Sequence, residues 1–296
     1  MNPSTRFETP ILRRLSAFTA DPRGGNPAGV WIGPALPDAA EMQRIAADIG
    51  DSETAFVAPA EGLQRTIRYY SPKAEVSFCG HATIATGVLL GELDGVATAP
   101  VTYRLATTVG EVPVEVRRAG HGLYEASLTS VEPRHRLPEN ALMDEALEAL
   151  GWSRADLDPS IPPAVAYAGA WHLVLAVRDA ATLDGLDYDF DRLARCMTEA
   201  GLTTLQLIHR ESETLFHSRN PFPVGGVVED PATGASAAAL GGYLRDAGLL
   251  TAPATFQILQ GEAMGRPSQL RVDVPVAGGI TVTGTAVSLE TAEEEA

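Results

Sequence analysis

Apolar and polar residues alternate along several stretches of the chain with the two-residue period of half-buried β-strands. The alternation is clearest at residues 101–105, 110–116 and 123–128. Apolar, β-branched or aromatic runs predict further strands at residues 11–18, 30–32, 54–57, 66–70, 164–168, 171–177, 205–208, 214–219, 255–260, 269–274 and 279–287. Because alternation is typical of antiparallel sheets with one face toward the core, we expect mostly antiparallel pairing.

Other segments carry apolar residues at the spacing of an amphipathic helix. They lie at residues 38–49, 140–150 and 190–200, and glycines follow the first two as helix ends. Two more helices are predicted from runs of small residues that begin at Gly80 and Gly234. Residues 184–191 are expected to form a loop.

The two small-residue helices belong to similar stretches of sequence. When Gly80 is aligned with Gly234, Gly87 falls on Gly241 without a gap. In each copy an extended segment and a turn after a proline lead into the helix. Two copies of one arrangement predict a duplicated architecture.

These elements predict an α+β fold with two similar domains, each holding several antiparallel strands around one small-residue helix. The expected domains are residues 1–130 and 131–280, and the polar segment 132–138 is the expected crossing between them. The strand near residues 280–296 is a candidate to return to the first domain.

The starts of the two small-residue helices are candidate anion sites. Small side chains leave the first-turn N–H groups accessible, and these groups and the helix dipole both favour negative charge. Taken alone, the stretch at Gly234 is better interpreted as a structural helix with a cap. Taken together, two such helix starts predict a pocket for a small carboxylate substrate.

Charge and composition narrow the class of protein. The net charge of −16 disfavours nucleic acids and anionic membranes as partners, because their phosphates would be repelled. The two cysteines show neither a metal-binding spacing nor a disulfide framework, which favours a reducing cytoplasm. We expect neither a signal peptide nor a membrane-spanning segment, because the sequence shows no pattern typical of the first and no apolar run long enough for the second. We therefore expect a soluble cytoplasmic protein.

Five residues near the glycine-containing turns could carry chemistry, although each has a structural alternative. Glu53 and Asp230 are acids at turns, His81 follows Gly80 at a helix start, and Asn26 lies in a glycine- and proline-rich loop. Cys79 precedes the same helix, and burial beside an aromatic residue is the stronger interpretation for it. Jointly, the acids and the imidazole supply a proton donor and a proton acceptor beside an anion pocket. The residues thus indicate an acid–base enzyme that needs no cofactor or metal.

Five motifs, which follow one another from the first loop to the C-terminal strands, resemble the PhzF-like family, named for the isomerase of phenazine biosynthesis. They are Gly25-Asn-Pro-Ala-Gly-Val, Ser52-Glu-Thr-Ala-Phe, Phe78-Cys-Gly-His-Ala-Thr, Glu229-Asp-Pro-Ala-Thr-Gly and Gln260-Gly-Glu-Ala-Met-Gly-Arg-Pro-Ser. The resemblance implies the diaminopimelate-epimerase fold, with two similar domains, each a curved sheet or barrel around a central helix. It also implies a homodimer.

In that family a glutamate moves a proton between carbons of trans-2,3-dihydro-3-hydroxyanthranilate without metal or cofactor. By motif, Glu53 resembles this glutamate, and His81 and Asp230 resemble its partners. Gly80 and Gly234 resemble the positions whose backbone amides hold the substrate.

The chain departs from the family pattern at Ala235, where a serine is usual. Ser236 comes one residue later, and one helical step turns a side chain by about 100°. We therefore expect that Ser236 does not replace the missing hydroxyl, so the identity of the substrate stays open. Asn26 and Ala235 are further candidates for substrate binding.

Two other functions stay open. One is a racemase or epimerase of an amino or hydroxy acid that uses Cys79 as a base, although the second repeat has no matching cysteine. The other is a binding protein that has kept the pocket and lost catalysis, which the missing serine favours.

Overall fold

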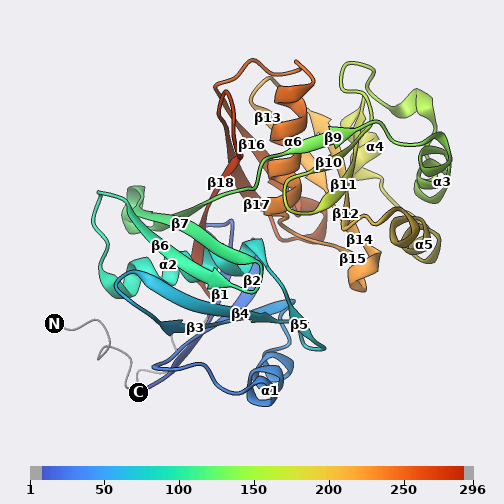
Figure 1. Ribbon diagram of the computed structural model, residues 1–296. Coiled ribbons are helices and arrows are strands. Elements are labelled where there is room, and N and C mark those ends of the chain that lie inside the picture. Colours follow the sequence, from blue (N-terminus) through green and yellow to red (C-terminus); the bar gives the residue numbers. More distant parts are fainter. Residues whose placement is uncertain (1–8, 290–296) are drawn as a thin grey trace. The chain divides into compact units, whose positions relative to one another are not determined.

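The computed structural model describes residues 9–289, and the chain forms two compact units (Figure 1). Unit 1 contains the described residues up to 128 and those from 283 onward, and unit 2 contains residues 129–282. The chain therefore passes from one unit to the other twice. Among residues 9–289, no helix has the length and apolar character needed to cross a membrane.

Unit 1 is built on a closed barrel of eight strands. In barrel order these are β1 (Ile11–Ala17), β2 (Asn26–Ile32), β3 (Glu53–Pro59), β4 (Gln64–Tyr70), β6 (Val101–Thr107), β7 (Gly110–Arg118), β8 (Tyr124–Thr129) and β18 (Thr281–Ser288). The last strand closes the barrel because β18 pairs with β1 in antiparallel register. A short strand, β5 (Glu75–Val76), pairs with β4.

The helix α2 (Gly80–Asp94) packs against the strands of this barrel. It is apolar on all sides and is buried from His81 to Gly91, as expected for a helix that strands surround. Gly87 permits the close approach, since a Cβ there would lie 2.9 Å from both Val114 Cγ1 and Ala126 Cβ.

A second helix of unit 1, α1 (Ala39–Ile49), is amphipathic and contacts β3 and β4. Asp38 caps its start by accepting a hydrogen bond from the N–H of Glu41, and Gly50 ends it in the left-handed conformation. Its buried face packs on aromatic side chains of the barrel wall, including Phe56 and Tyr70.

Unit 2 has a run of paired strands that packs around the helix α6 (Gly234–Asp246). In sheet order its strands are β17 (Ser268–Val274), β16 (Ala254–Gln260), β13 (Leu215–Arg219), β12 (Thr204–Arg210), β11 (Trp171–Val177), β10 (Ala164–Tyr167) and β9 (Arg134–Arg136). A small separate hairpin joins β14 (Pro221–Phe222) and β15 (Val227–Glu229). Single 3-10 turns occur at Gly120–Gly122 in unit 1 and at Arg154–Asp156, Pro223–Gly225 and Glu262–Met264 in unit 2.

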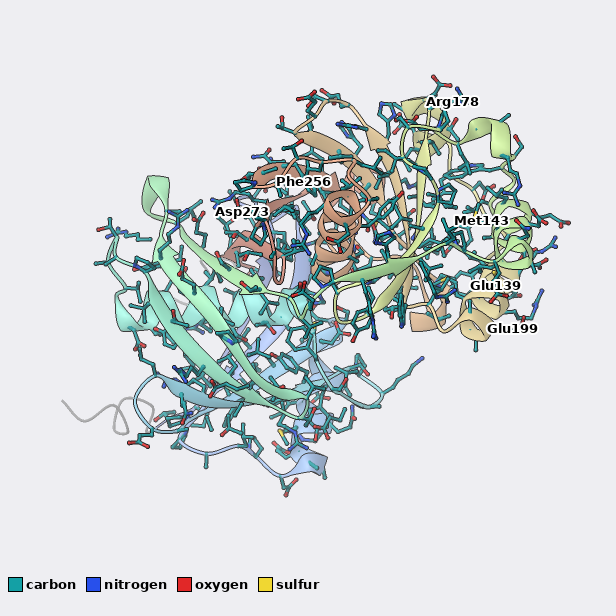
Figure 2. The ribbon with its side chains drawn as sticks, turned by 45° about the horizontal axis from the view of Figure 1, so that its top comes forward. Glu139, Met143, Arg178, Glu199, Phe256 and Asp273 are labelled. Carbon is teal, nitrogen blue, oxygen red and sulfur yellow. The ribbon has the colours of Figure 1, made fainter. Side chains whose placement is uncertain are left out.

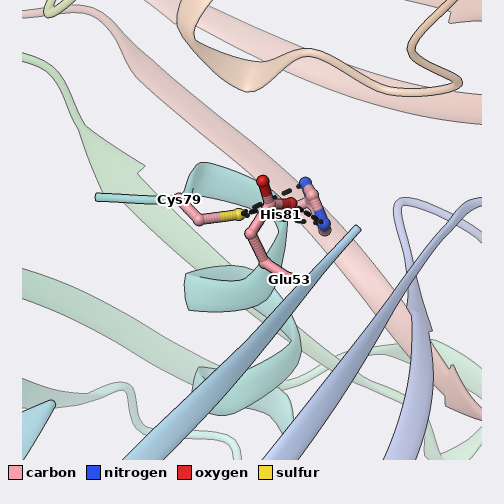
Figure 3. A group of neighbouring side chains, drawn as sticks. All are labelled: Glu53, Cys79 and His81. Atoms are coloured by element: carbon pink, nitrogen blue, oxygen red, sulfur yellow. Dashed lines mark hydrogen bonds and ion pairs between the residues drawn. The ribbon is translucent and has the colours of Figure 1, made fainter. Parts of the chain in front are cut away.

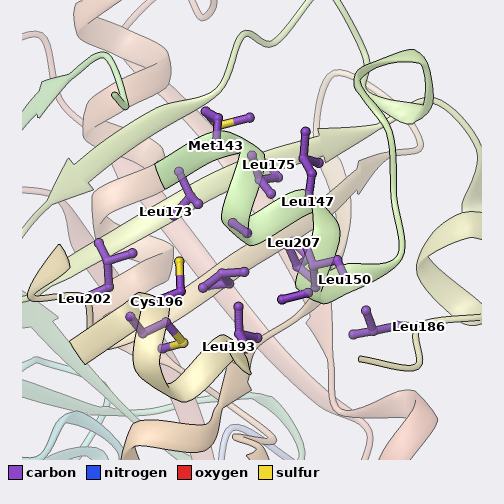
Figure 4. Packing of buried hydrophobic residues seen from close by; sticks show 14 of the residues in the cluster. Met143, Leu147, Leu150, Leu173, Leu175, Leu186, Leu193, Cys196, Leu202 and Leu207 are labelled. Atoms are coloured by element: carbon purple, nitrogen blue, oxygen red, sulfur yellow. The ribbon is translucent and has the colours of Figure 1, made fainter. Parts of the chain in front are cut away.

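Three further helices belong to unit 2: α3 (Asn140–Leu150), α4 (Ala180–Asp184) and α5 (Phe190–Ala200). Their apolar faces and those of β11 and β12 form one core of leucines with Met143 and Cys196 (Figure 4). Met143 is buried there, whereas Glu139 and Glu199 are exposed at the start of α3 and near the end of α5 (Figure 2).

The predicted repeat is present in the structure. The helices α2 and α6 begin at the aligned residues Gly80 and Gly234, and the aligned Gly87 and Gly241 both face strands. Some local predictions were wrong. Asn26, which was expected in a loop, is the first residue of β2. Segment 132–138 lies inside unit 2 and contains β9, which pairs with β10, so it is not the crossing between the units. The loop expected at 184–191 starts inside α4 and ends inside α5.

Candidate active site

Glu53 is the first residue of β3, at the point where the chain enters the barrel from the end of α1. The preceding turn is anchored by Asp51, whose carboxylate accepts two hydrogen bonds from Arg14 at 2.9 and 2.6 Å. Such a two-pronged pair fixes geometry better than a single ionic contact. The backbone at Glu53 is therefore held in place. The side chain of Glu53 is 20% exposed, so the carboxylate also has access to solvent.

His81 is the second residue of α2, and its side chain is only 8% exposed. Its Nε2 lies 3.3 Å from Glu53 Oε2 and 3.2 Å from Ser52 Oγ. On the other side of the ring, the Asn26 amide nitrogen lies 3.2 Å from Nδ1. When the amide donates to Nδ1, the neutral ring carries its proton on Nε2 and directs it toward Glu53.

Cys79 completes a compact cluster with these two residues (Figure 3). Its Sγ lies 3.5 Å from Glu53 Oε2, 3.4 Å from His81 Nδ1 and 3.7 Å from His81 Nε2. The expected burial of Cys79 is present, but the thiol contacts a carboxylate and an imidazole.

Two buried hydroxyl groups, which contact each other, hold the start of α2 in place. Tyr69 Oη and Thr83 Oγ1 are 2.6 Å apart, and Thr83 Oγ1 donates to the carbonyl of Cys79 at 2.6 Å. Burial raises the pKa of Tyr69 well above its ordinary value, so its hydroxyl stays neutral. These bonds fix the backbone that carries Cys79 and His81.

The first turn of α2 leaves space for a ligand. Cys79 is the N-cap residue and makes no side-chain cap hydrogen bond within the described chain. A Cβ added at Gly80 would meet no atom within 4 Å, so the space beside this residue is open. Unsatisfied first-turn amides next to open space can bind an anion.

The candidates of the second repeat lie in unit 2, at the start of α6. Thr233 donates from its hydroxyl to Asp230 Oδ2 at 2.5 Å, and Gln260 Nε2 donates to the carbonyl of Asp230 at 2.7 Å. The N–H of Asp230 donates to the carbonyl of Asn220 at 3.0 Å. The loop that carries the Asp230 carboxylate is therefore held at both its ends.

Ala235 is half-buried beside Gly234 in the first turn of α6. Ser236 is fully buried, donates to the carbonyl of Thr233 at 3.0 Å, and accepts from Asn220 Nδ2 at 2.8 Å. The hydroxyl of Ser236 thus serves the interior of unit 2, as expected from the helical rotation between positions 235 and 236.

The structure gathers Glu53, His81, Asn26 and Gly80 in unit 1, and Asp230, Gly234 and Ala235 in unit 2. Sequence reasoning gave no role to three residues that contact these candidates: Ser52, Thr233 and Gln260. All three lie inside the motifs that carry the family resemblance, which is the signal that could have found them.

The chain matches the family model described as "Phenazine biosynthesis-like protein" over residues 15–292. An uncharacterized isomerase of Deinococcus radiodurans is 34% identical, and the match covers 93% of this chain and 91% of that protein. The trans-2,3-dihydro-3-hydroxyanthranilate isomerase of Pseudomonas chlororaphis is 30% identical, with 86% of each chain covered. These relatives are isomerases, which confirms the prediction that the chain is an isomerase.

Solved structures support the fold. A phenazine biosynthesis protein of the PhzF family from Bacillus anthracis has a TM-score of 0.83 at 24% identity, covering 95% of this chain and 98% of that one. A probable proline racemase from Agrobacterium radiobacter has a TM-score of 0.62 at 14% identity, covering 95% and 91%. The predicted α+β fold, duplicated and epimerase-like, is confirmed. The chain belongs to the phenazine biosynthesis-like, or PhzF, family.

Proposed function

We propose that the protein is a cofactor-independent isomerase that moves a proton between two carbons of a small carboxylate substrate. The observation that carries the proposal is the 3.3 Å contact between Glu53 Oε2 and His81 Nε2 beside the open first turn of α2. A positioned carboxylate, an imidazole and an anion-binding helix start are sufficient for proton transfer next to a bound carboxylate.

Glu53 is the proton carrier in this proposal. Its carboxylate removes a proton from one carbon, the electron pair shifts along the substrate, and the same carboxyl group returns the proton to another carbon. His81 donates a hydrogen bond from Nε2 to the carboxylate and steadies its orientation, while Asn26 fixes the ring through Nδ1. Substrate and product have the same atoms, so no other reactant is required.

The proposed substrate binds through its carboxylate to the first-turn amides at Gly80. The activity named for the Pseudomonas chlororaphis relative makes a small cyclic amino acid the first class to test. We assign Asp230 as an assisting acid and Gly234 and Ala235 as substrate-binding positions of the second repeat. A homodimer in the cytoplasm, without nucleic-acid or membrane partners, completes the proposal.

Deuterium exchange tests the role of Glu53. The protein is incubated in D2O with trans-2,3-dihydro-3-hydroxyanthranilate and with a panel of small amino and hydroxy acids, and carbon-bound deuterium is followed by NMR. For the substrate that exchanges, Glu53→Gln should slow incorporation by about 10²-fold or more, because a positioned acid–base group contributes about 10²–10⁴-fold. Glu61→Gln changes an exposed glutamate of the same unit and should leave the rate unchanged.

Undiminished exchange in Glu53→Gln would sink the assignment of the proton carrier. Ligand binding without exchange in the unmodified protein would instead favour the non-catalytic alternative.

A racemase that uses Cys79 is a weaker candidate. Two-base racemisation needs a base on each face of the reacting carbon, whereas Cys79 Sγ and Glu53 Oε2 lie side by side, 3.5 Å apart. Inversion of configuration that is lost in Cys79→Ser and kept in Glu53→Gln would favour this candidate over the isomerase.

A further inference from the structure

The turn before α6 contains a threonine whose hydroxyl does not cap the helix. Thr233 is the N-cap residue of α6, but its side chain makes no cap hydrogen bond within the described chain. A threonine at this position ordinarily accepts a hydrogen bond from an N–H group of the first helical turn. Here its Oγ1 instead donates to Asp230 Oδ2 at 2.5 Å. The hydroxyl therefore serves the carboxylate and leaves the first-turn amides of α6 uncapped by this side chain.

Gln260, at the end of β16, lies against the same turn and is only 1% exposed. Its Nε2 lies 2.7 Å from the carbonyl oxygen of Asp230, and its Oε1 lies 3.2 Å from the backbone nitrogen of Thr233. A backbone carbonyl can only accept and a backbone N–H can only donate. These two contacts therefore fix which end of the amide is nitrogen and which is oxygen.

The amide also sets the direction of the threonine hydroxyl. Gln260 Nε2 lies 3.0 Å from Thr233 Oγ1. An amide nitrogen carries donors only, so Oγ1 accepts from it and donates its own proton to Asp230 Oδ2. Glutamine, threonine and aspartate thus form a chain of hydrogen bonds in which every donor points toward the carboxylate.

We propose that Gln260 and Thr233 are positioning residues that hold Asp230 as an oriented carboxylate. Gln260 acts through Thr233, and Thr233 acts on Asp230. A hydrogen bond donated to a carboxylate favours its ionised form, so the chain sets the charge of Asp230 as well as its direction. The importance of the chain for the reaction rests on the proposed function, in which Asp230 assists, whereas the chain itself rests only on the geometry.

Gly261 permits the close approach of Gln260 to the turn. Its φ is +78°, and a Cβ there would lie 2.8 Å from the carbonyl oxygen of Pro231. A side chain at this position would separate the end of β16 from the turn. The Gln-Gly pair of the last family motif therefore has a physical reason, because the glutamine supplies the amide and the glycine lets it reach the turn.

The charged residues beside the turn are engaged in pairs of their own. Glu229 precedes Asp230 and pairs with Arg219. Glu262 lies in the 3-10 turn after β16, and its Oε2 is 3.1 Å from His217 Nδ1. Removal of the threonine hydroxyl alone should leave both pairs in place. A change in the titration of Asp230 would then report the lost hydrogen bond.

Carbon-13 NMR tests the chain without any measurement of activity. The aspartate carboxyl carbons are labelled, the signal of Asp230 is identified by its loss in Asp230→Asn, and its titration is followed with pH. Thr233→Val keeps the shape of the side chain and removes the hydroxyl, so Asp230 should keep its proton to a pH that is higher by roughly one unit. Thr233→Ser retains a hydroxyl and should restore the original titration.

A second variant tests the glutamine. Gln260→Met removes the amide that directs the hydroxyl, so it should move the titration in the same direction, but less far because the hydroxyl remains. Gln257→Met changes an exposed glutamine of the same strand and should have no effect. Thr255→Val, which breaks an exposed hydroxyl–carboxylate contact of 2.6 Å with Asp273, should have none either.

An unchanged titration of Asp230 in a folded Thr233→Val or Gln260→Met variant would overturn the proposal. So would a Thr233→Ser variant that titrates like the valine variant. If Thr233→Val does not fold, Gln260→Met decides by the same criterion.

Activity is measured afterwards, with the substrate that shows deuterium exchange. Thr233→Val should slow the exchange by about tenfold, through kcat more than KM, because the carboxylate is no longer held in one orientation. Thr233→Ser should restore most of the rate. A shifted titration with undiminished exchange would contradict the assisting role of Asp230 in the proposed function and leave the hydrogen-bond chain intact.

Discussion

His172 is a fully buried titratable side chain in the sheet of unit 2. Its Nδ1 lies 2.8 Å from Thr204 Oγ1, and its Nε2 has no hydrogen-bond partner among the described residues. Burial lowers the pKa of His172 from 6.5 to about 3, because the charged imidazolium would lose its hydration. The residue therefore stays neutral in the folded protein at physiological pH.

This burial predicts an acid-sensitive stability. Between pH 6.5 and about 3, the unfolded chain binds a proton at His172 that the folded chain does not. The free energy of unfolding should therefore fall as the pH drops through this range, by up to about 1.4 kcal/mol per pH unit from this site. Urea unfolding at several pH values measures the slope.

His172→Gln should reduce that slope, whatever its effect on stability at pH 7. His135→Gln replaces an exposed histidine of unit 2 and should leave the slope as it is. Equal slopes in all three proteins would show that His172 is not the responsible group.

At the same scale, the motifs predicted roles for Glu53 and His81 but did not predict their contacts. Glu53 and Cys79 are 26 residues apart in the chain, so no local spacing relates the carboxylate to the thiol. They meet because the barrel places the start of β3 beside the start of α2. The sequence alone therefore does not place the thiol beside the carboxylate.

The close packing of α2 depends on the absence of a side chain at Gly87. Replacing a glycine inside a helix by alanine is normally stabilising by roughly 0.5–1 kcal/mol. At Gly87 the new methyl group would lie 2.9 Å from Val114 Cγ1 and Ala126 Cβ, which belong to the barrel wall. Overpacking of this kind destabilises by about 1–3 kcal/mol.

Gly87→Ala should thus lower the free energy of unfolding, against the usual direction for this substitution. Glu92→Ala changes an exposed position of the same helix and should alter stability by less than about 0.5 kcal/mol. Chemical denaturation of both variants decides the matter. A stabilised Gly87→Ala variant would mean that α2 is less closely surrounded than the structure indicates.

Element ends were predictable where capping chemistry marks them. Gly50 and Gly151 both end helices in the left-handed conformation, and the predicted helix 140–150 has the bounds of α3. The strand β9 was missed because its three residues are polar and exposed, so they show no alternation. The helix α4 was missed because five residues are too few for a helical period.

At the scale of the whole molecule, the C-terminal strand β18 completes unit 1. It pairs with β1 at Leu15, Ser16 and Ala17, and the hydroxyls of Ser127 and Thr283 are 2.8 Å apart. Without β18 the barrel would have two open edges, at β1 and β8. An open barrel of this kind exposes unpaired backbone groups and apolar side chains.

Truncation tests this dependence. A chain ending at residue 280 should lose the cooperative thermal unfolding of unit 1, because its barrel cannot close. A chain ending at residue 289 keeps every described strand and should unfold like the full chain. Circular dichroism melting compares the three, and an unchanged transition in the shorter chain would contradict the structural role of β18.

The return of the chain could be suggested from the strand pattern near residues 280–296, but its partner could not. Strand pairing between residues 15–17 and 286–288 is set by closure of the barrel, and no local pattern in either segment specifies the other. The sequence repeat predicted the number of units, whereas the order of the strands is known only from the structure.

The split of unit 1 between the two ends of the chain also has a consequence for synthesis on the ribosome. Unit 2 is continuous, so all of its residues are made before residue 283 is added. At about 5–20 residues per second, the strands β1 to β8 wait on the order of 10–30 s for β18. Unit 1 is therefore the first to be synthesised and the last to complete its fold. During that interval it can bind chaperones or aggregate.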